Sequence, residues 1–339
     1  MEINKMKVFH GLVNYGTQAG LFAKELRNDG IEAISVVIAD PFQRLIDVEL
    51  RHSGNFVQKV YKHSLNYLFR VRCMLKYNIF HFYYGKTLLP RQIDLYFYKL
   101  TNKKVIFHYL GGDVDTYPTS SDGLDYYGAK INNKPTIKRL KHETKFASFQ
   151  FVCAPCYCQF VKNSIVLPLA IDLQNFEYIP ANVALGRKIK ILHAPTNRRF
   201  KNSDYIENAI DRLTEEGYDI EYICISNVTH AQLIKEYIKA DLVIDQLNFW
   251  YGTVSIEAMA LGKPVIAGYD DQFFKYIDYG DEIPIINANI DNIYTVLKRT
   301  IDNRYLLPEI GKKSREFVTQ IHDLKRLTRC LITYYKNLF

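Results

Sequence analysis

The chain has 339 residues, of which 48% are hydrophobic and 24% are charged, and its formal net charge is +8. This composition is typical of folded globular proteins and excludes a disordered chain. No segment reaches the roughly 18 consecutive apolar residues that a membrane-spanning helix needs, and the length predicts two domains.

The N-terminal sequence MEINKMKVFHGL has no apolar core followed by small residues, so no secretory signal is predicted. Six cysteines in such a chain indicate a reducing compartment instead of a disulfide framework. Three of them, in CAPCYC at 153–158, lack a second Cys or His pair at zinc spacing, so buried thiols are predicted there. We expect a cytoplasmic protein, either free or bound peripherally to the inner face of the cell membrane.

Short apolar runs alternate with helical segments through the first half of the chain. The runs KMKVFHGL, EAISVVI, NIFHFYY, KVIFHYL, SFQFVCA and SIVLPL each predict a strand, and residues 17–28 predict an amphipathic helix. Buried apolar runs separated by helices are typical of a parallel sheet with helices on both faces. Residues 1–172 are therefore predicted to form a first Rossmann-like domain.

A basic segment interrupts this series, because no acidic residue occurs between Glu49 and Asp94. From Lys59 to Lys76, Phe, Tyr and Leu alternate with Lys, Arg and His, which predicts a basic amphipathic helix. Two interpretations stay open. The helix docks on an anionic membrane surface, or its apolar side faces the core and its basic side faces water. Nucleic acid is not an expected partner, since zinc-finger spacing and RNP-like strings are missing.

The alternation restarts after residues 172–188, which show neither helix nor strand periodicity and predict a linker. The runs IKILHAP, IEYICIS, LVIDQL and PVIAG predict strands, with helices at about 203–216 and 230–240 between them. A short helix after LVIDQL is predicted to carry Glu257 in its first turn. Residues 173–321 are predicted as a second doubly wound Rossmann-like domain, so the fold class is α/β.

Ligands of doubly wound sheets bind beyond the carboxyl ends of the strands. The loop HAPTNRRFKN lies there and precedes a helix that starts near Ser203. Its cations Arg198, Arg199 and Lys201 predict a diphosphate site, because positive charge and free helix N–H groups both attract phosphate. A solvated basic loop is the alternative interpretation.

The segment DQLNFWYGTVSIEAMALGKPVIAGYDD adds a second group of candidates. Gly252 and Thr253 would donate backbone N–H groups to the same phosphates, and the Glu257 carboxylate could accept two hydroxyl protons from a ribose. The alternative is purely structural, since an acidic residue at a helix N-terminus complements the macrodipole. GKT at 85–87 is not a Walker A motif, because Phe80 occupies the position of the first glycine.

YGTVSIEAMALGKPVIAG resembles the G-x-x-x-x-E-A-x-A-x-G-x-P-V-[IV] stretch of retaining glycosyltransferases of the GT-B fold, family 4. Further segments are similar to that family in chain order: HGLVNYGTQAGLFAKELRNDG to its first glycine loop, HYLGGDVD to its aromatic-Gly-x-Asp segment, LPLAIDLQNF to its domain junction, and HAPTNRRFKNSDYIENAI to its phosphate loop. The resemblance implies two Rossmann-like domains that face a central cleft, with a last helix at about 322–339 packed back on the first domain.

The resemblance also implies an activity: transfer of a sugar, with retention, from a nucleotide-sugar donor to a saccharide or lipid-linked saccharide acceptor. Such enzymes serve cell-surface polysaccharide or glycoconjugate synthesis, and generally need no bound metal or other cofactor. The implied catalytic residues are His108 and Asp113 on the acceptor side and Lys201 at the leaving group. The implied donor-binding residues are Gly16, Thr17, His193, Asn197, Arg198, Arg199, Lys201, Asp245, Gly252, Thr253 and Glu257.

The chain departs from the family pattern at three positions. Phe249 stands where many members carry the first of two glutamates, Thr196 stands where an arginine often precedes the lysine, and Thr17 follows Gly16 where the first loop carries two adjacent glycines. Phe249 leaves open a non-catalytic partner protein that keeps the fold and binds a nucleotide. A nicotinamide dehydrogenase is disfavoured, because no G-x-G-x-x-G follows any predicted strand.

Overall fold

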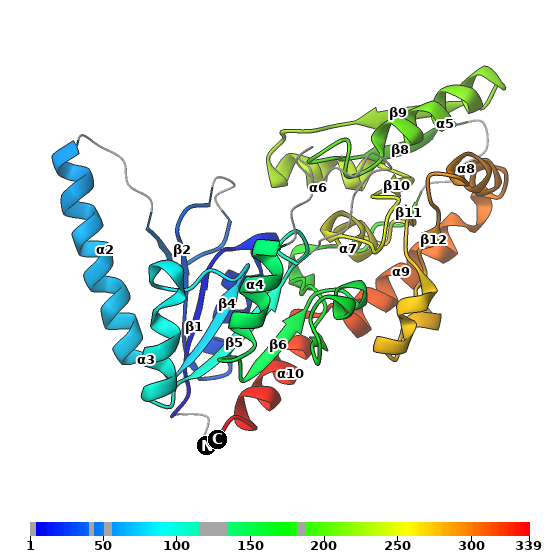
Figure 1. The fold of residues 1–339 in the computed structure, drawn as a ribbon. Coiled ribbons are helices and arrows are strands. Elements are labelled where there is room, and N and C mark those ends of the chain that lie inside the picture. The colour runs from blue at the N-terminus through cyan, green and yellow to red at the C-terminus, as the bar shows by residue number, and fades with distance from the viewer. Residues whose placement is uncertain (1–4, 41–43, 51–55, 115–133, 182–186) are drawn as a thin grey trace. The chain divides into compact units, whose positions relative to one another are not determined.

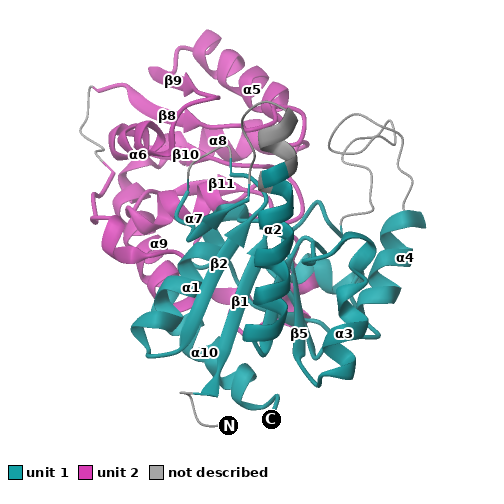
Figure 2. Ribbon diagram, turned by 90° about the vertical axis from the view of Figure 1, so that its left-hand side faces the viewer, with its two compact units in different colours: residues 1–118, 130–170, 324–339 teal, residues 119–129, 171–323 magenta. Residues whose placement is uncertain are grey.

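The computed structural model describes residues 5–40, 44–50, 56–114, 134–181 and 187–339, with the backbone alone given for residues 56–60 and 62 (Figure 1). These residues divide into two compact units. Unit 1 contains the described residues up to 114, residues 134–170 and residues 324–339, and unit 2 contains the described residues from 171 to 323 (Figure 2).

Unit 1 is built on a seven-stranded sheet with the order β3-β2-β1-β4-β5-β6-β7, and every pair in it is parallel. The strands are β1 (Lys7–Leu12), β2 (Glu32–Val37), β3 (Val48–Glu49), β4 (Ile79–Tyr83), β5 (Lys104–Tyr109), β6 (Phe149–Val152) and β7 (Ile165–Val166). The helices are α1 (Gln18–Asn28), α2 (Phe56–Lys76), α3 (Asp94–Leu100), α4 (Lys134–Glu143) and α10 (Leu324–Lys336).

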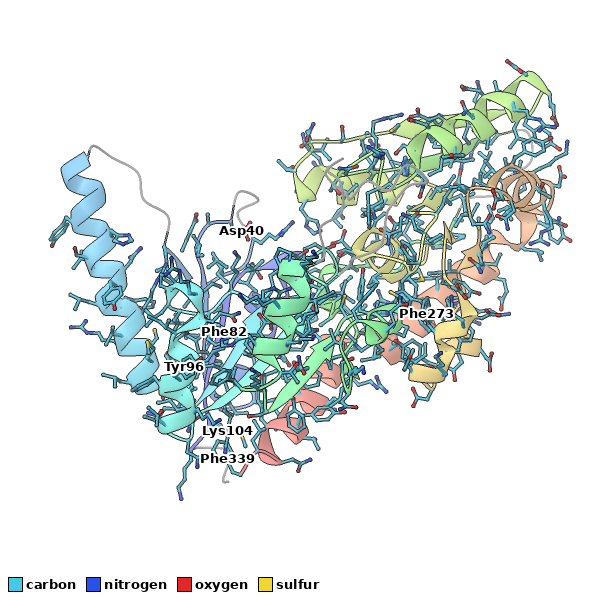
Figure 3. All side chains as sticks on the ribbon, in the orientation of Figure 1. Asp40, Phe82, Tyr96, Lys104, Phe273 and Phe339 are labelled. Atoms are coloured by element: carbon cyan, nitrogen blue, oxygen red, sulfur yellow. The ribbon has the colours of Figure 1, made fainter. Side chains whose placement is uncertain are left out.

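Helices cover both faces of this sheet. Successive side chains of a strand point to opposite faces, and because both sets are apolar here, each face needs a covering layer. In β4, Phe80 and Phe82 belong to the core under α2, α3 and α4 (Figure 3). Their neighbour Ile79 belongs to the core under α1 and α10. The last helix, α10, thus packs on unit 1, where Leu327 and Leu331 are buried in the same core as Ile79.

Unit 2 repeats the plan with a five-stranded parallel sheet of order β12-β11-β10-β8-β9. The strands are β8 (Ile189–His193), β9 (Ile220–Cys224), β10 (Leu242–Ile244), β11 (Val265–Ala267) and β12 (Ile286–Asn287). The helices are α5 (Ser203–Glu215), α6 (His230–Lys239), α7 (Thr253–Ala260), α8 (Ile293–Asp302) and α9 (Leu307–Ile321).

Both sheets are parallel and lie within mixed α/β units, which confirms the predicted fold class of two doubly wound Rossmann-like domains. Each strand predicted from an apolar run is present. Among the helices of the described ranges, none is both long enough and apolar enough to span a bilayer.

Candidate functional site

The strand order of unit 2 reverses between β8 and β10. β9 follows β8 on one side, and the chain then returns to place β10 on the other side, so that His193 pairs with Ile244. The loops that leave these two strands therefore start side by side. In open α/β sheets this reversal is where ligands bind.

Lys201 and Asp245 come from these two loops and form a buried ion pair. The Lys201 Nζ lies 2.5 Å from Asp245 Oδ1 and 2.7 Å from Gln246 Oε1. Only 7% of Lys201 and 1% of Asp245 is exposed. Burial by itself would raise the pKa of Asp245. The charge of Lys201 and the hydrogen bonds that the Asp245 carboxylate accepts outweigh burial and hold that pKa below its usual value. The lysine cation is thus fixed by its surroundings before any ligand binds.

Asp245 also caps α7. Its Oδ2 accepts hydrogen bonds from the backbone N–H of Gly252 at 3.1 Å, from the backbone N–H of Ser255 at 3.3 Å, and from the Ser255 hydroxyl at 2.7 Å. The Gly252 N–H therefore donates to the Asp245 carboxylate, whereas the sequence predicts that it donates to a phosphate. Thr253 begins α7 directly after Gly252. This carboxylate accordingly orders both the lysine and the start of the helix.

Glu257 lies in the second turn of α7, since the helix begins at Thr253, and its predicted place in the first turn is wrong. The macrodipole acts mainly within the first turn, so the purely structural interpretation loses its main support. The Glu257 carboxylate is 12% exposed, and its Oε1 lies 2.9 Å from Nε2 of His230 at the start of α6. Burial, and then the Glu257 charge, raise the pKa of the neighbouring Tyr237 well above its usual value. The structure thus holds Glu257 in a defined position beside its exposed partner His230.

The other predicted residues of the β8 loop have different environments. Arg198 is exposed and pairs with Asp204 and Glu207, which lie on α5. Arg199 is also exposed, and Asn197 supports the loop by accepting a hydrogen bond from the Phe200 N–H at 3.0 Å. Exposure of both arginines agrees with the solvated-loop interpretation, whereas Lys201 is the buried cation at the strand-order reversal.

His193 is buried at the end of β8, and both of its ring nitrogens have partners. Nδ1 lies 2.9 Å from the Ile244 carbonyl, and Nε2 lies 2.7 Å from the Ser203 hydroxyl. A carbonyl can only accept, so Nδ1 carries the proton and Nε2 accepts from Ser203. Burial lowers the pKa of His193, which keeps the ring neutral. His193 therefore joins β8, β10 and the start of α5. Both of its ring nitrogens bond within the protein, so neither is left to bind a nucleotide-sugar donor.

In unit 1 the strand order reverses between β1 and β4. The loop after β1 contains Gly16 and Thr17, whose φ angles of 53° and 64° are both left-handed. The Gly16 carbonyl accepts a hydrogen bond from Gln18 Nε2 at 2.8 Å, and Gln18 in turn bonds the backbone of Ala170. Gly16 suits this conformation, whereas Thr17 is strained in it, and such strain is concentrated at functional sites.

Asp113 follows β5 and carries a partly unsatisfied carboxyl group. Its Oδ1 accepts from the backbone N–H groups of Leu110 at 3.0 Å and Gly111 at 2.9 Å. Its Oδ2 is buried and has no hydrogen-bond partner within the described part of the chain. Burial raises the pKa of Asp113 to about 7, although the Arg139 charge opposes the shift. A carboxyl group with such a pKa can accept or release a proton near neutral pH. Asp115, the last residue of HYLGGDVD, lies outside the described residues.

His108, the second acceptor-side candidate, is fully buried within unit 1. Its Nδ1 lies 3.3 Å from Nε2 of His81, whose Nδ1 lies 2.8 Å from the Tyr335 hydroxyl of α10. The His10 Nδ1 lies 2.9 Å from the Tyr83 hydroxyl in the same interior layer. The structure therefore places His108, the last but one residue of β5, in an internal hydrogen-bond network where an acceptor sugar has no access.

These three histidines should remain neutral well into the acidic range. Burial lowers the pKa of His10 and of His108 to about 3, and lowers that of His81 well below its usual value. The unfolded chain, with ordinary pKa values near 6.5, then binds more protons than the folded chain, so these side chains reduce stability as the pH falls below about 6.5. We expect their NMR signals in [13C]histidine-labelled protein to keep neutral shifts down to about pH 5. Free histidine in the same sample supplies the reference curve. Protonation of any of the three above that pH would contradict the arrangement.

Sequence reasoning missed Gln246, Ser255 and His230, which complete the contacts of Lys201, Asp245 and Glu257. Gln246 directly follows Asp245, so the signal for it was a second polar residue at a strand end. Within the described ranges, no group of three or more His, Cys, Asp or Glu side chains could hold a metal ion.

No protein-family model matches this chain, and no curated protein matches its sequence. Solved structures do match. Sucrose-phosphate synthase from Thermosynechococcus elongatus is 14% identical, with a TM-score of 0.65 and 99% of each chain covered. HepE from Anabaena, solved with UDP and glucose, is 12% identical, with a TM-score of 0.62, 98% of this chain and 100% of that chain covered.

A third match is a Listeria monocytogenes protein described as a UDP-N-acetylglucosamine 2-epimerase, 14% identical, with a TM-score of 0.54, 98% of this chain and 96% of that chain covered. Identities this low establish the fold alone. The fold shared by these proteins is GT-B, so the chain has the fold that its sequence resemblance implied.

Proposed function

We propose that the chain is a glycosyltransferase that moves a sugar from a nucleotide-sugar donor to a saccharide or lipid-linked saccharide acceptor with retention of configuration. Cell-surface polysaccharide or glycoconjugate synthesis is its proposed setting. One observation carries the proposal: Lys201, Asp245 and the start of the Glu257 helix meet at the strand-order reversal of unit 2. A buried cation and a held carboxylate there match the diphosphate and the ribose of one donor.

Lys201 is proposed to stabilise the leaving diphosphate. Two of the three N–H donors of its ammonium group bond to Asp245 and Gln246, which leaves one donor for a phosphate oxygen. The group is already held in place, so little reorganisation is needed as negative charge grows on the leaving group. With this cation at the phosphates, transfer is proposed to need no metal cofactor, and EDTA is expected to leave the rate unchanged.

Glu257 is proposed to accept the two ribose hydroxyl protons. Its Oε1 already lies 2.9 Å from His230, but a carboxylate oxygen has two lone pairs and can accept a second hydrogen bond. Oε2 is proposed to accept the other hydroxyl proton. Uridine diphosphate sugars are the first donors to test, because HepE was solved with UDP.

In unit 1, Asp113 is proposed to support acceptor binding, because its carboxyl group orders the loop after β5 through the Leu110 and Gly111 N–H groups and its raised pKa suits proton exchange near neutral pH. The Gly16–Thr17 turn, at the strand-order reversal of the same unit, is proposed to bind ligand as well.

Phe249 supports a second candidate, a non-catalytic protein that binds a nucleotide. This residue has a φ of 39° and lies, partly exposed, in the loop between β10 and α7. A phenyl ring cannot accept the hydrogen bonds that a glutamate would accept at that position. Without those contacts the protein would still bind the nucleotide, but it would hold the sugar that is to be transferred less firmly.

A thermal-shift screen against UDP, GDP, ADP and CMP sugars tests the proposal. A ligand at 100 times its dissociation constant stabilises the native state by about 2.7 kcal/mol, so one nucleotide class is expected to raise Tm by several degrees. The matching sugar 1-phosphates serve as controls.

Product analysis then separates the candidates. New glycoside that requires an acceptor supports transfer, and its anomeric configuration tests retention. Conversion of the donor without any acceptor would indicate an epimerase, and stabilisation without any product would indicate the non-catalytic protein. Failure of all four nucleotide classes to stabilise the chain would contradict the proposal.

A further inference from the structure

Three helices of unit 1 form one layer on the same face of its sheet. Cys73 and Met74 of α2, Leu95 and Tyr98 of α3, and Leu140 of α4 are buried in a single core cluster on that face. The opposite face is covered by α1 and α10. The other sides of α2, α3 and α4 therefore point away from the sheet, and Figure 2 shows these helices on one side of unit 1.

The outer side of this three-helix layer exposes large apolar side chains. On α2, Tyr61 is 65% exposed and Leu75 is 66% exposed, with Leu65 and Leu68 exposed between them. Spacings of four, three and seven residues place all four along one stripe of the helix. The layer continues on α3, where Tyr96 (Figure 3) is exposed and Leu100 is 87% exposed. A helix with basic residues facing water and apolar residues facing only the core would not show this stripe, so the ordinary interpretation of α2 is incomplete.

The same layer exposes positive charge without negative charge. In residues 56–114 and 134–148, as far as the structure describes them, each acidic side chain is buried: Asp94, Asp113 and Glu143. Asp94 accepts hydrogen bonds from Thr87 and Leu88, and Glu143 accepts them from several neighbours, so neither contributes to the surface. Exposed cations remain on all three helices or just after them: Arg72, Lys99, Lys138, Lys141 and Lys145. Lys76 at the end of α2 is exposed as well, but it pairs with Glu32 of β2 at 2.5 Å.

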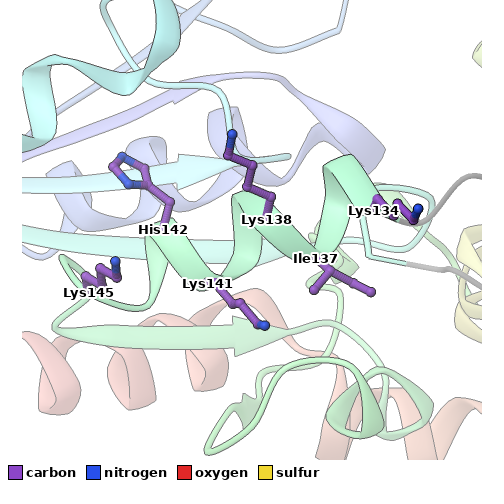
Figure 4. A pocket seen from close by; sticks show the side chains of 6 residues that line it. All are labelled: Lys134, Ile137, Lys138, Lys141, His142 and Lys145. Carbon is purple, nitrogen blue, oxygen red and sulfur yellow. The ribbon is translucent and has the colours of Figure 1, made fainter.

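The cations of α4 are gathered around a surface hollow of about 500 Å³ (Figure 4). Its lining residues are Lys134, Ile137, Lys138, Lys141, His142 and Lys145. The lysines follow spacings of four, three and four residues, which places them along one stripe of α4 and its C-terminal extension. Such a stripe suits a row of phosphate groups, while Ile137 keeps an apolar side chain within it.

We propose that the outer side of the α2–α3–α4 layer docks unit 1 on an anionic phospholipid surface. Its exposed Leu and Tyr side chains enter the boundary between headgroups and acyl chains, and its Lys and Arg side chains contact lipid phosphates. A second copy of the chain is a poorer occupant, because two faces that both carry an excess of positive charge repel each other. Nucleic acid would leave the leucine stripe of α2 without an apolar partner.

Flotation of the full chain with vesicles tests this proposal and needs neither a donor nor an acceptor. Vesicles of phosphatidylcholine with phosphatidylglycerol should carry the protein, neutral phosphatidylcholine vesicles should not, and binding should decline as salt rises. The test variant removes four charges of the layer: Arg72→Gln, Lys138→Gln, Lys141→Gln and Lys145→Gln. Its partition to anionic vesicles should fall by about 10²–10³.

The matched control removes four exposed lysines of unit 2: Lys235→Gln, Lys275→Gln, Lys312→Gln and Lys313→Gln. It lowers the net charge equally and should keep nearly all of the binding. The double variant Leu65→Ser with Leu68→Ser should bind anionic vesicles more weakly, while the decline of its binding with salt should stay as in the wild type. The proposal is overturned by equal binding to neutral vesicles, by absence of binding to either kind, or by equal losses in the two four-charge variants. It is also overturned if Leu65→Ser with Leu68→Ser instead abolishes a dimer in solution.

Discussion

Lys201→Ala is expected to slow sugar transfer by about 10²–10³ in kcat, the usual loss when one preorganised donor at a developing negative charge is removed. The same change should destabilise unit 2 by about 3–5 kcal/mol, because it leaves the Asp245 carboxylate buried without its cation. The loss of stability arises from the 2.5 Å contact between Lys201 Nζ and Asp245 Oδ1, and the loss of rate arises from the missing cation at the leaving diphosphate. Urea unfolding measures the loss of stability. Release of nucleoside diphosphate, measured where the variant is still folded, gives the loss in kcat.

A double variant separates the two roles of Lys201. Lys201→Met with Asp245→Asn removes both charges, and the Asn oxygen can still accept hydrogen bonds from Gly252 and Ser255. Most of the lost stability should return, whereas transfer should stay slow because no cation faces the phosphate. Full activity in the double variant would show that the lysine acts only through stability, and unchanged stability in Lys201→Ala would contradict the buried ion pair.

Glu257→Gln is expected to raise the KM for the donor by about 10- to 100-fold with a smaller change in kcat. Hydrogen bonds to a charged group are worth about 1.5–3 kcal/mol, which sets the size of the effect. If the carboxylate binds the ribose equally well in the ground state and the transition state, its loss changes KM and not kcat. The variant should remain folded, because Gln preserves the size of the side chain and one oxygen.

His230→Gln is the matched control for Glu257→Gln. It removes the protein partner of the carboxylate at 2.9 Å but leaves both carboxylate oxygens in place. Initial rates over a range of donor concentrations should therefore show a large effect only for Glu257→Gln. An equal rise in KM for both variants would mean that the Glu257–His230 contact, and not a contact with ribose, explains the result.

Much of the fold was predictable because apolar runs of four to seven residues mark buried parallel strands. What was missed had weak local signals. The strand β3 has only two residues, and α3 spans seven residues, DLYFYKL, whose aromatic side chains favour strands as much as helices. The first residue of α7 depends on Asp245, which accepts its capping hydrogen bonds from seven and ten positions further along the chain.

The candidate site was predictable as a set of residues but not as a set of contacts. Lys201 and Asp245 lie 44 positions apart, and only the parallel pairing of β8 with β10 brings them together. His108 is an acceptor-side candidate because HYLGGDVD resembles the aromatic-Gly-x-Asp segment of the family. The register that pairs it with Tyr83 is a tertiary feature, and no local pattern indicates that the ring joins His81 in the interior.

Calorimetric titration of the full chain with UDP, GDP and ADP tests the central claim most directly, since it needs no acceptor and no knowledge of the sugar. At least one nucleoside diphosphate should bind the wild-type chain, and Glu257→Gln should weaken that binding by about tenfold or more. Lys312→Gln with Lys313→Gln, far along the chain on α9, should bind as the wild type does. Absence of binding by all three nucleotides, or equal affinity in wild type and Glu257→Gln, would contradict a nucleotide-sugar site at the β8–β10 reversal.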